Sequence, residues 1–390
     1  MKEWIKISDL LFFQEGPGVR NTQYTQSGVK LLNVANLVNG KVDLSTSDRY
    51  ISEDEAYGRY KHFLCDDGDF IIASSGIKVE YFDRKMGFVD SSMLPLCMNT
   101  STIRFKVIDS KRLNIKYFMY YLKSIHFKQQ LSKFITGSAQ LNFGPSHLKK
   151  MNMPLVSLKE QNDIVEKLSK VELLLDKYNG EIKLLDELIK ARFVEMFGDP
   201  VDNPMNWKKK KLKDIVTEDC TISYGIVQTG EEQKEGIPVF RPVDIVNHTP
   251  KVEELKKTTE FISDRYKKTL LKGHELLITV RANIADTFIA NEEFLGCNVG
   301  RGIVPIRTQE DIMRLEFLKC LIDNKHLNDI LKSKAKGITL IQLNMEDLRN
   351  VELIIPPIDL QLDYLKYSRL IDKSRLLSNH SLFLIKSLIF

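Results

Sequence analysis

The chain has 390 residues, of which 43% are hydrophobic and 28% charged, and its formal net charge is +5. This length suggests two or three domains, each with its own core, and so small a net charge does not by itself indicate a nucleic-acid partner. The five cysteines are scattered without a CxxC pair, which predicts a cytoplasmic protein with no disulfide frame and no zinc site. No apolar run reaches the ~18 residues that suggest a membrane span.

In chain order, short runs rich in β-branched residues alternate with amphipathic segments. The runs at 69–74, 102–107, 275–280 and 302–307 predict strands. The segments Leu113–Leu131 and Arg314–Leu331 predict helices, because their apolar residues recur at helical spacing. Each half of the chain is therefore expected to be an α+β domain, with its helix after most of its strands.

The sequence also repeats itself, with a period of about 200 residues. The stretch 137–161 aligns without a gap with 337–361, so that Gly137 matches Gly337 and Gln161 matches Gln361. Weaker similarity links 31–42 with 239–252 and 60–76 with 266–283. The period is far longer than the 20–50 residues of solenoid repeats, and it indicates duplication of a whole domain.

A long helix is predicted at the end of each copy. Between Ser157 and Phe197 there is no proline, and Gly198 and Pro200 follow as stop signals. Apolar residues with alternating steps of four and three predict a coiled-coil seam, and they are Ile164, Leu168, Val171, Leu175, Tyr178, Ile182, Leu185 and Ile189. The second helix is expected from Ile358 to Phe390, with a weaker seam of Leu370, Leu377 and Leu384 and with Tyr367 and Leu388 beside it.

Such helices need a partner, because a single apolar stripe cannot be buried alone. The simplest partner for each helix is the other copy. Antiparallel pairing would place the two domains at opposite ends of a rod, related by an approximate two-fold axis. The expected division is a first domain at 1–156, a central helix at 157–198, a second domain at 199–357 and a C-terminal helix at 358–390.

Catalytic signatures are absent from the sequence. It contains no GxxxxGK[ST], HExxH or GxSxG motif, and no Asn/Asp-Pro-Pro-aromatic motif of methyltransferases. No catalytic, cofactor or metal residue is therefore assigned. Two similar domains held at a fixed separation favour binding to a ligand that repeats along its length, and duplex DNA with two half-sites is such a ligand.

Four segments, 137–140, 154–168, 189–200 and 354–361, resemble the DNA-specificity (S) subunit of type I restriction–modification enzymes. The resemblance extends over essentially the whole chain. It implies that each domain is a target-recognition domain for one half of a bipartite DNA sequence, and that an antiparallel pair of helices sets the spacing. It also implies two methylation subunits and motor-nuclease subunits as partners, which would carry S-adenosylmethionine, ATP and magnesium, while this chain is not catalytic.

The resemblance places the DNA-reading loops after central strands, at 74–85 and 279–286. The first-choice residues there are Ser75, Lys78, Arg281 and Asn283. Arginine and lysine can donate to guanine, and asparagine can pair with adenine. An ordinary exposed hairpin is the alternative for both loops.

Other candidates for DNA contact are less specific. Gln140 and Thr339 lie in the loops that follow Gly137 and Gly337, where a simple turn before a helix is an equally good interpretation. Weaker candidates are Arg20, Tyr24, Tyr224, Arg241 and Arg301. Lys208 to Lys211 would neutralise phosphates without reading sequence, or form a solvated surface run.

Three alternatives remain open. The first is that the chain serves as the specificity subunit of another restriction–modification assembly, which the sequence does not distinguish. A coiled-coil scaffold with protein-binding end domains predicts little affinity for DNA. A free-standing nuclease predicts metal-dependent cleavage by the chain alone.

Overall fold

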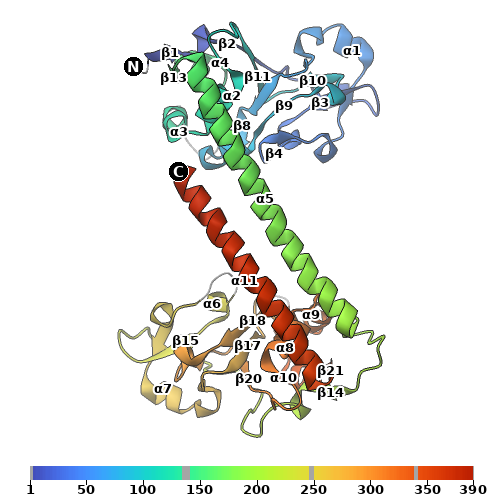
Figure 1. Cartoon of the computed structure of the whole chain (residues 1–390), viewed down its shortest axis with the longest axis vertical. Helices are drawn as coiled ribbons and strands as arrows, with labels where there is room; N and C mark the ends of the chain where they lie inside the picture. The colour runs from blue at the N-terminus through green and yellow to red at the C-terminus, as the bar shows by residue number, and fades with distance from the viewer. Residues whose placement is uncertain (1–2, 134–140, 246–249, 338–340, 390) are drawn as a thin grey trace. The chain divides into compact units, whose positions relative to one another are not determined.

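The computed structural model describes residues 3–133, 141–245, 250–337 and 341–389. Its contacts divide the chain into two units, Met1–Leu175 and Asp176–Phe390, so the boundary falls inside the long helix α5 (Leu158–Phe197). Each unit contains strands and short helices together (Figure 1), which confirms the predicted α+β class. In the described part of the chain all five cysteines are free thiols, and no helix is both long and apolar enough to cross a membrane.

The first unit is built from short strands and four short helices. The strands are β1 (Glu3–Lys6), β2 (Leu11–Glu15), β3 (Val29–Leu32), β4 (Leu37–Val38), β5 (Lys41–Val42), β6 (Tyr50–Ile51), β7 (Phe70–Ala73), β8 (Ser75–Ile77), β9 (Met86–Phe88), β10 (Leu96–Met98), β11 (Thr102–Val107), β12 (Leu141–Asn142) and β13 (Asn152–Leu155). The helices are α1 (Glu53–Tyr57), α2 (Ile115–Lys123), α3 (Ile125–Ser132) and α4 (Pro145–Leu148). The main sheet has the order β2-β11-β7-β9, a second sheet has the order β10-β3-β6, and β1 pairs with β13.

The second unit repeats this plan. Its strands are β14 (Lys209–Lys211), β15 (Ile237–Phe240), β16 (Lys256–Thr258), β17 (Glu275–Thr279), β18 (Thr287–Ala290), β19 (Asn298–Val299), β20 (Ile303–Ile306) and β21 (Glu352–Ile354). Its helices are α6 (Pro242–Ile245), α7 (Glu260–Asp264), α8 (Leu315–Asp323), α9 (Lys325–Ser333), α10 (Met345–Arg349) and α11 (Ile358–Ile389). β17 lies between β18 and β20 as β7 lies between β9 and β11, and the parallel pair β15–β19 matches β3–β10. The repeat in the sequence is therefore a repeat of the fold.

Each predicted amphipathic helix is in fact two helices. The first breaks at Ser124, between α2 and α3, and the second breaks at Asn324, between α8 and α9. The side chain of Ser124 accepts a hydrogen bond from the Phe127 amide, and that of Asn324 accepts from the amides of His326 and Leu327. Both residues thus act as N-caps of a new helix, which apolar periodicity alone does not reveal.

A buried glutamine fixes the start of each long helix on its own domain. In the first unit the Asn114 amide donates to Gln161 Oε1 (2.9 Å), and Gln161 Nε2 donates to the Arg112 carbonyl (2.8 Å). Gln361 does the same in the second unit, where it accepts from the Arg314 amide at 3.0 Å and donates to the Ile312 carbonyl at 3.1 Å. These bonds satisfy backbone groups that burial would otherwise leave unpaired, which accounts for the glutamine in both copies of the repeated segment.

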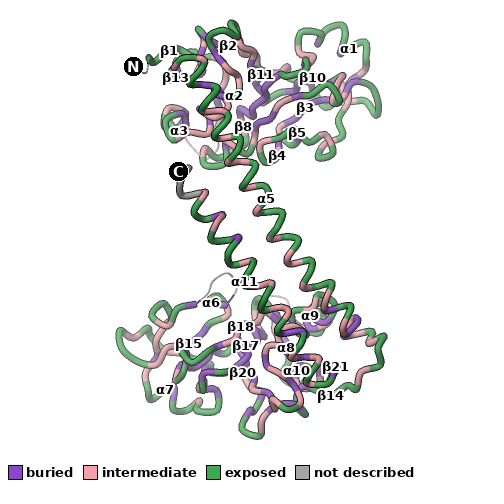
Figure 2. The backbone as a smooth tube through the Cα atoms, viewed as in Figure 1, coloured by how far each residue is buried: buried purple, intermediate pink, exposed green. Residues whose placement is uncertain are grey.

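The predicted seam of the first long helix is confirmed. All eight of its positions from Ile164 to Ile189 are partly buried, whereas most of their neighbours are exposed (Figure 2). Within the second unit α5 packs against α11: the rings of Phe193 and Tyr364 lie 5.5 Å apart, and Arg375 forms an ion pair with Asp186 at 2.8 Å. From residue 193 to residue 186 of α5 the contact partner in α11 changes from residue 364 to residue 375, so these segments are antiparallel.

The predicted seam of the second long helix is wrong. Leu370, Leu377 and Leu384 are 67%, 64% and 47% exposed, Tyr367 is half-buried, and the side chain of Leu388 lies outside the described residues. One set of buried or partly buried positions recurs with the same alternating steps but one residue later, and it consists of Tyr364, Ser368, Ile371, Arg375, Ser378, Leu382 and Ile385. Three of these side chains are polar and one is charged, so the apolar pattern of α11 marks its outer face.

Candidate nucleic-acid interface

In the first unit the loop expected to read DNA at 74–85 pairs with residues that come directly after the repeated glycine segment. Strand β8, in this loop, pairs antiparallel with β12. The Phe143 amide donates to the Ser74 carbonyl (3.0 Å), and the Ser74 amide donates to the Ser101 carbonyl (2.8 Å). The Asn99 amide in turn donates to the Leu32 carbonyl at 3.0 Å. Loops from four parts of the sequence are thereby joined into one backbone framework, called the loop frame below.

The second unit contains the same loop frame at matching positions. The Leu343 amide donates to the Val280 carbonyl (2.9 Å), and the Val280 amide donates to the Gly302 carbonyl (2.8 Å). The Gly300 amide donates to the Phe240 carbonyl at 2.8 Å. A side chain at residue 302 would meet Pro242 at 2.5 Å and the Cβ of Arg281 at 3.4 Å, so glycine allows these loops to approach closely.

The two loop frames have the same backbone bonds but different side chains. Ser75 in the first frame occupies the position of Arg281 in the second, because each follows a matching hydrogen-bonded residue. By the same register, Thr100 corresponds to Arg301 and Asn33 corresponds to Arg241. The second frame therefore brings three arginines together where the first frame has neutral polar residues.

In the first unit the residues predicted to contact DNA differ in their exposure and in whether their side chains already have a partner. Ser75 is half-buried, and its Oγ donates to Ser101 Oγ at 2.6 Å. Lys78 and Arg20 are exposed, and neither side chain forms an ion pair with any residue that the structure describes. The hydroxyl of Tyr24 accepts from Asn99 Nδ2 at 3.4 Å, beside the frame. Gln140 lies outside the described residues, as does Thr339 of the second unit.

In the second unit Arg281 and Arg241 have partners. Arg281 Nε donates to Gln342 Oε1 at 2.7 Å. Arg241 is bound to Asp244 through Nε and Nη2, at 3.2 and 2.9 Å, so one edge of its guanidinium is occupied by a carboxylate. Arg301 and Asn283 are exposed, and the carbonyl of Asn283 accepts from the Thr279 hydroxyl. Tyr224 is half-buried against the core, which agrees better with packing than with DNA contact.

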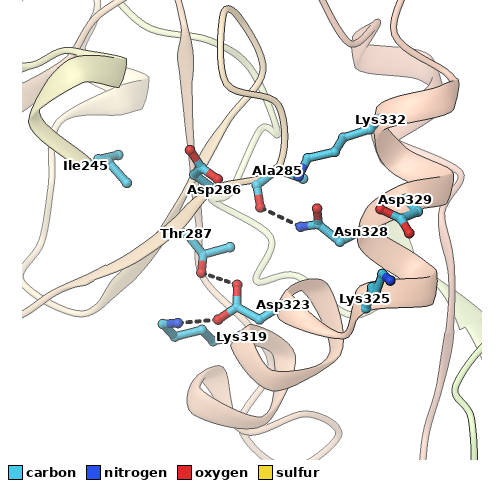
Figure 3. A pocket seen from close by; sticks show the side chains of 10 residues that line it. All are labelled: Ile245, Ala285, Asp286, Thr287, Lys319, Asp323, Lys325, Asn328, Asp329 and Lys332. Atoms are coloured by element: carbon cyan, nitrogen blue, oxygen red, sulfur yellow. Dashed lines mark hydrogen bonds and ion pairs between the residues drawn. The ribbon is translucent and has the colours of Figure 1, made fainter. Parts of the chain in front are cut away.

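A pocket of about 560 Å³ is lined by Ala285, Asp286 and Thr287, where the 279–286 loop runs into β18, and by residues of α8 and α9 (Figure 3). On its wall Asn328 Nδ2 donates to the Ala285 carbonyl at 2.9 Å, and Asp323 accepts from the Thr287 hydroxyl at 2.5 Å and pairs with Lys319. Burial raises the pKa of the Asp286 carboxyl, which Lys332 opposes and Asp323 reinforces. These contacts hold the base of the loop on α8 and α9.

Sequence reasoning missed two residues that position this loop, Gln342 and Asn328. The sequence could have indicated Gln342, because it lies in the repeated segment at the position of Asn142. Asn328 gives no sequence signal, since an exposed helix face carries many such amides. The basic run is largely strand β14, which pairs with β21, and none of the hydrogen bonds of the loop frame involves it.

One strained residue in the second loop yields a stability prediction. Ala282 has a φ of +62°, whereas the first unit has Gly76, with a φ of +73°, at the matching position. Ala282→Gly is expected to raise the free energy of unfolding by up to about 1 kcal/mol, because relief of left-handed strain exceeds the added flexibility of the unfolded chain. Thermal unfolding measures the change.

The control for this variant is Ala290→Gly. Ala290 is fully buried in β18 and is not among the residues with positive φ. The same chemical change there should lower stability by about 0.5–1 kcal/mol, because glycine weakens a strand and removes a packed methyl group. Equal destabilisation by both variants would contradict the strain argument.

Solved structures of type I systems share this fold. The S subunit of a type I restriction–modification system from M. genitalium matches 100% of this chain and 94% of its own, with a TM-score of 0.58 and 14% identity. A chain from a type I restriction–modification system studied for complex assembly and conformational transition matches 100% of this chain and 95% of its own, with a TM-score of 0.56 and 18% identity.

Curated relatives show sequence similarity. The specificity subunit of the type I restriction enzyme EcoBI from Escherichia coli is 23% identical over 232 residues, which are 54% of this chain and 49% of that protein. The putative MjaX specificity subunit from Methanocaldococcus jannaschii is 24% identical over 274 residues, which are 66% of this chain and 61% of that protein. The chain thus aligns with about half to three-fifths of the length of these relatives.

The family model described as "type I restriction modification DNA specificity domain" matches residues 2–185 and again residues 204–373. The two matches together cover most of the sequence, and each includes one loop frame. The chain therefore belongs to the family of type I restriction–modification DNA specificity domains, and it contains two copies of that domain.

Proposed function

We propose that this chain is the DNA-specificity subunit of a type I restriction–modification complex. Its recognition domains, 1–156 and 199–357, each read one half of a bipartite target, and the bases between the halves are not read. The observation that carries this proposal is the pair of loop frames, which are alike in backbone bonds and different in side chains. Such a pair is suited to present two different sets of contacts to two half-sites.

The long helices at 157–198 and 358–390 would set the spacing and receive the partner subunits. Their outer faces carry large apolar side chains that are 45–69% exposed, and these are Leu184, Leu188, Leu370, Leu376, Leu377 and Phe383. Clustered apolar side chains on a helix face are typical of a protein interface. In the proposal two methylation subunits dock there. S-adenosylmethionine, ATP and magnesium belong to the methylation and motor-nuclease subunits, and this chain performs no catalysis.

The proposal is tested by mapping DNA methylation genome-wide in cells that carry the neighbouring methylation subunit, with and without this chain. A new two-part methylated motif with a fixed spacer, present only with this chain, is the expected result. If the complex assembles and no new motif arises, the chain is not acting as a specificity subunit, and a scaffold role becomes the better interpretation. Cleavage of DNA by the purified chain alone would contradict the non-catalytic role.

A further inference from the structure

Arg281 occupies the most constrained place in the second loop frame. It follows β17 directly after Val280, whose amide and carbonyl are both bound within the frame. Arg281 lies opposite Gln342 in an isolated antiparallel bridge, which is completed by a hydrogen bond from the Ala282 amide to the Ile341 carbonyl at 3.4 Å. The side chain is half-buried and starts beside Gly302. Its base therefore has little freedom to move.

The guanidinium group is restrained as well. Nε donates to Gln342 Oε1 at 2.7 Å, and among the residues that the structure describes no other acceptor contacts this group. Arginine has five N–H donors in a rigid plane, so fixing Nε orients the two terminal nitrogens and leaves them free. This is the geometry that donates two parallel hydrogen bonds to O6 and N7 of guanine in the major groove.

The neighbouring arginines lack this combination. Arg241 is held, but the Asp244 carboxylate pairs with its charge and occupies the Nε and Nη2 edge of the guanidinium, at 3.2 and 2.9 Å. Arg301 is exposed and has no side-chain partner among the described residues, which suits a phosphate contact that needs charge but no fixed plane. In the first unit the position of Arg281 is taken by Ser75, whose hydroxyl is bound to Ser101.

We propose that Arg281, positioned by Gln342, reads a guanine in the half-site of the second domain, and that the first domain has no equivalent contact. This inference rests on the proposed function. The two halves of the target then differ at one position, because only the second loop frame presents a guanidinium group there.

The test uses the methylation mapping described above, with the whole complex and with variants of this chain. The wild-type chain should give a guanine in one half of the motif. Arg281→Lys keeps the charge but loses the planar fork, so discrimination at that guanine should fall by about 5- to 150-fold while the other half stays unchanged. Gln342→Ala should relax the same base and no other, because the fork is then free to rotate.

A matched control is Ser75→Ala, which removes a hydroxyl at the same position of the first loop frame. Any effect of this variant should be confined to the other half of the motif. Arg281 is a phosphate contact instead, and the inference fails, if Arg281→Lys weakens methylation at all sites alike with the motif unchanged. It also fails if the relaxed base is not guanine. No chain-dependent motif with the wild-type sequence would overturn the proposed function itself, and that outcome is distinct from both of these.

Discussion

Arg104→Leu is expected to lower the free energy of unfolding of the first recognition domain by about 3–5 kcal/mol, because it leaves a buried carboxylate without its charged partner. Arg104 is nearly inaccessible in β11, and its Nη1 lies 3.1 Å from Oδ2 of Asp69, whose side chain is 2% exposed. The guanidinium also donates to the carbonyls of Leu64 and His62 and to Gln14 Oε1, at 2.6–2.8 Å. Removing it takes a donor from all four acceptors and leaves Asp69 Oδ2 with only the Asp66 amide, at 2.8 Å, among the hydrogen bonds of the described residues.

Urea unfolding can measure this change in one domain at a time. The chain has two tryptophans, Trp4 in the first unit and Trp207 in the second, so a Trp207→Phe background leaves a reporter for the first unit. Lys106→Leu is the matched control on the same strand. Lys106 is 38% exposed and lies 3.5 Å from Asp69, so its loss should cost about 0–1 kcal/mol.

A double variant separates the two causes of the loss. Asp69→Leu combined with Arg104→Leu removes both charges and should recover part of the lost stability, because an apolar pair leaves no buried charge unpaired. A loss below about 1 kcal/mol for Arg104→Leu alone would show that water or another group compensates Asp69. The second unit has a related pair, Arg307 and Glu275, at 3.0 Å.

Apolar periodicity predicts the buried face of a long helix only where the apolar residues are the buried ones. For α5 the periodicity identifies the seam because the apolar positions are the buried ones. For α11 it identifies the wrong face, since Leu370 and Leu377 are exposed while Arg375 and Ser378 are partly or fully buried. An apolar stripe has the same period whether it faces its own chain or a partner. The contacts of the folded chain mark the inner face, among them the ion pair between Arg375 and Asp186 and the ring contact between Tyr364 and Phe193.

The site follows a similar rule. The sequence predicts two of the four segments of each frame, because duplication marks one of them and the strand pattern marks the other. It does not predict which side chains are free. In the sequence Arg241 and Arg281 are equivalent candidates for DNA contact. In the structure the Arg241 guanidinium donates to Asp244, whereas Gln342 orients the guanidinium of Arg281. Gln342 lies 61 residues from Arg281, so only the folded chain shows the pair.

The second large effect is expected at Phe197, the last residue of α5. Its ring is fully buried in an aromatic cluster, with centroids 4.8 Å from Phe317, 5.2 Å from Phe193 and 5.7 Å from Tyr364. Its carbonyl accepts from Trp207 Nε1 at 3.0 Å. One side chain thus joins the end of α5 to α8 and α11, and the fold relies on it to fix the helix on the second recognition domain.

Phe197→Ala should lower the free energy of unfolding of the second unit by about 3–5 kcal/mol, the usual cost of a large buried ring and the cavity it leaves. Trp207 reports the transition in a Trp4→Phe background, and its indole lies 6.4 Å from the missing ring. Val194→Ala is the control, because Val194 is 54% exposed on the same helix and should change stability by no more than about 0.5 kcal/mol. If the two variants unfold alike, the aromatic cluster does not fix α5. If only Phe197→Ala unfolds early, and the first unit, followed through Trp4 in a Trp207→Phe background, keeps its own transition, the docking of this helix depends on packing at its last turn.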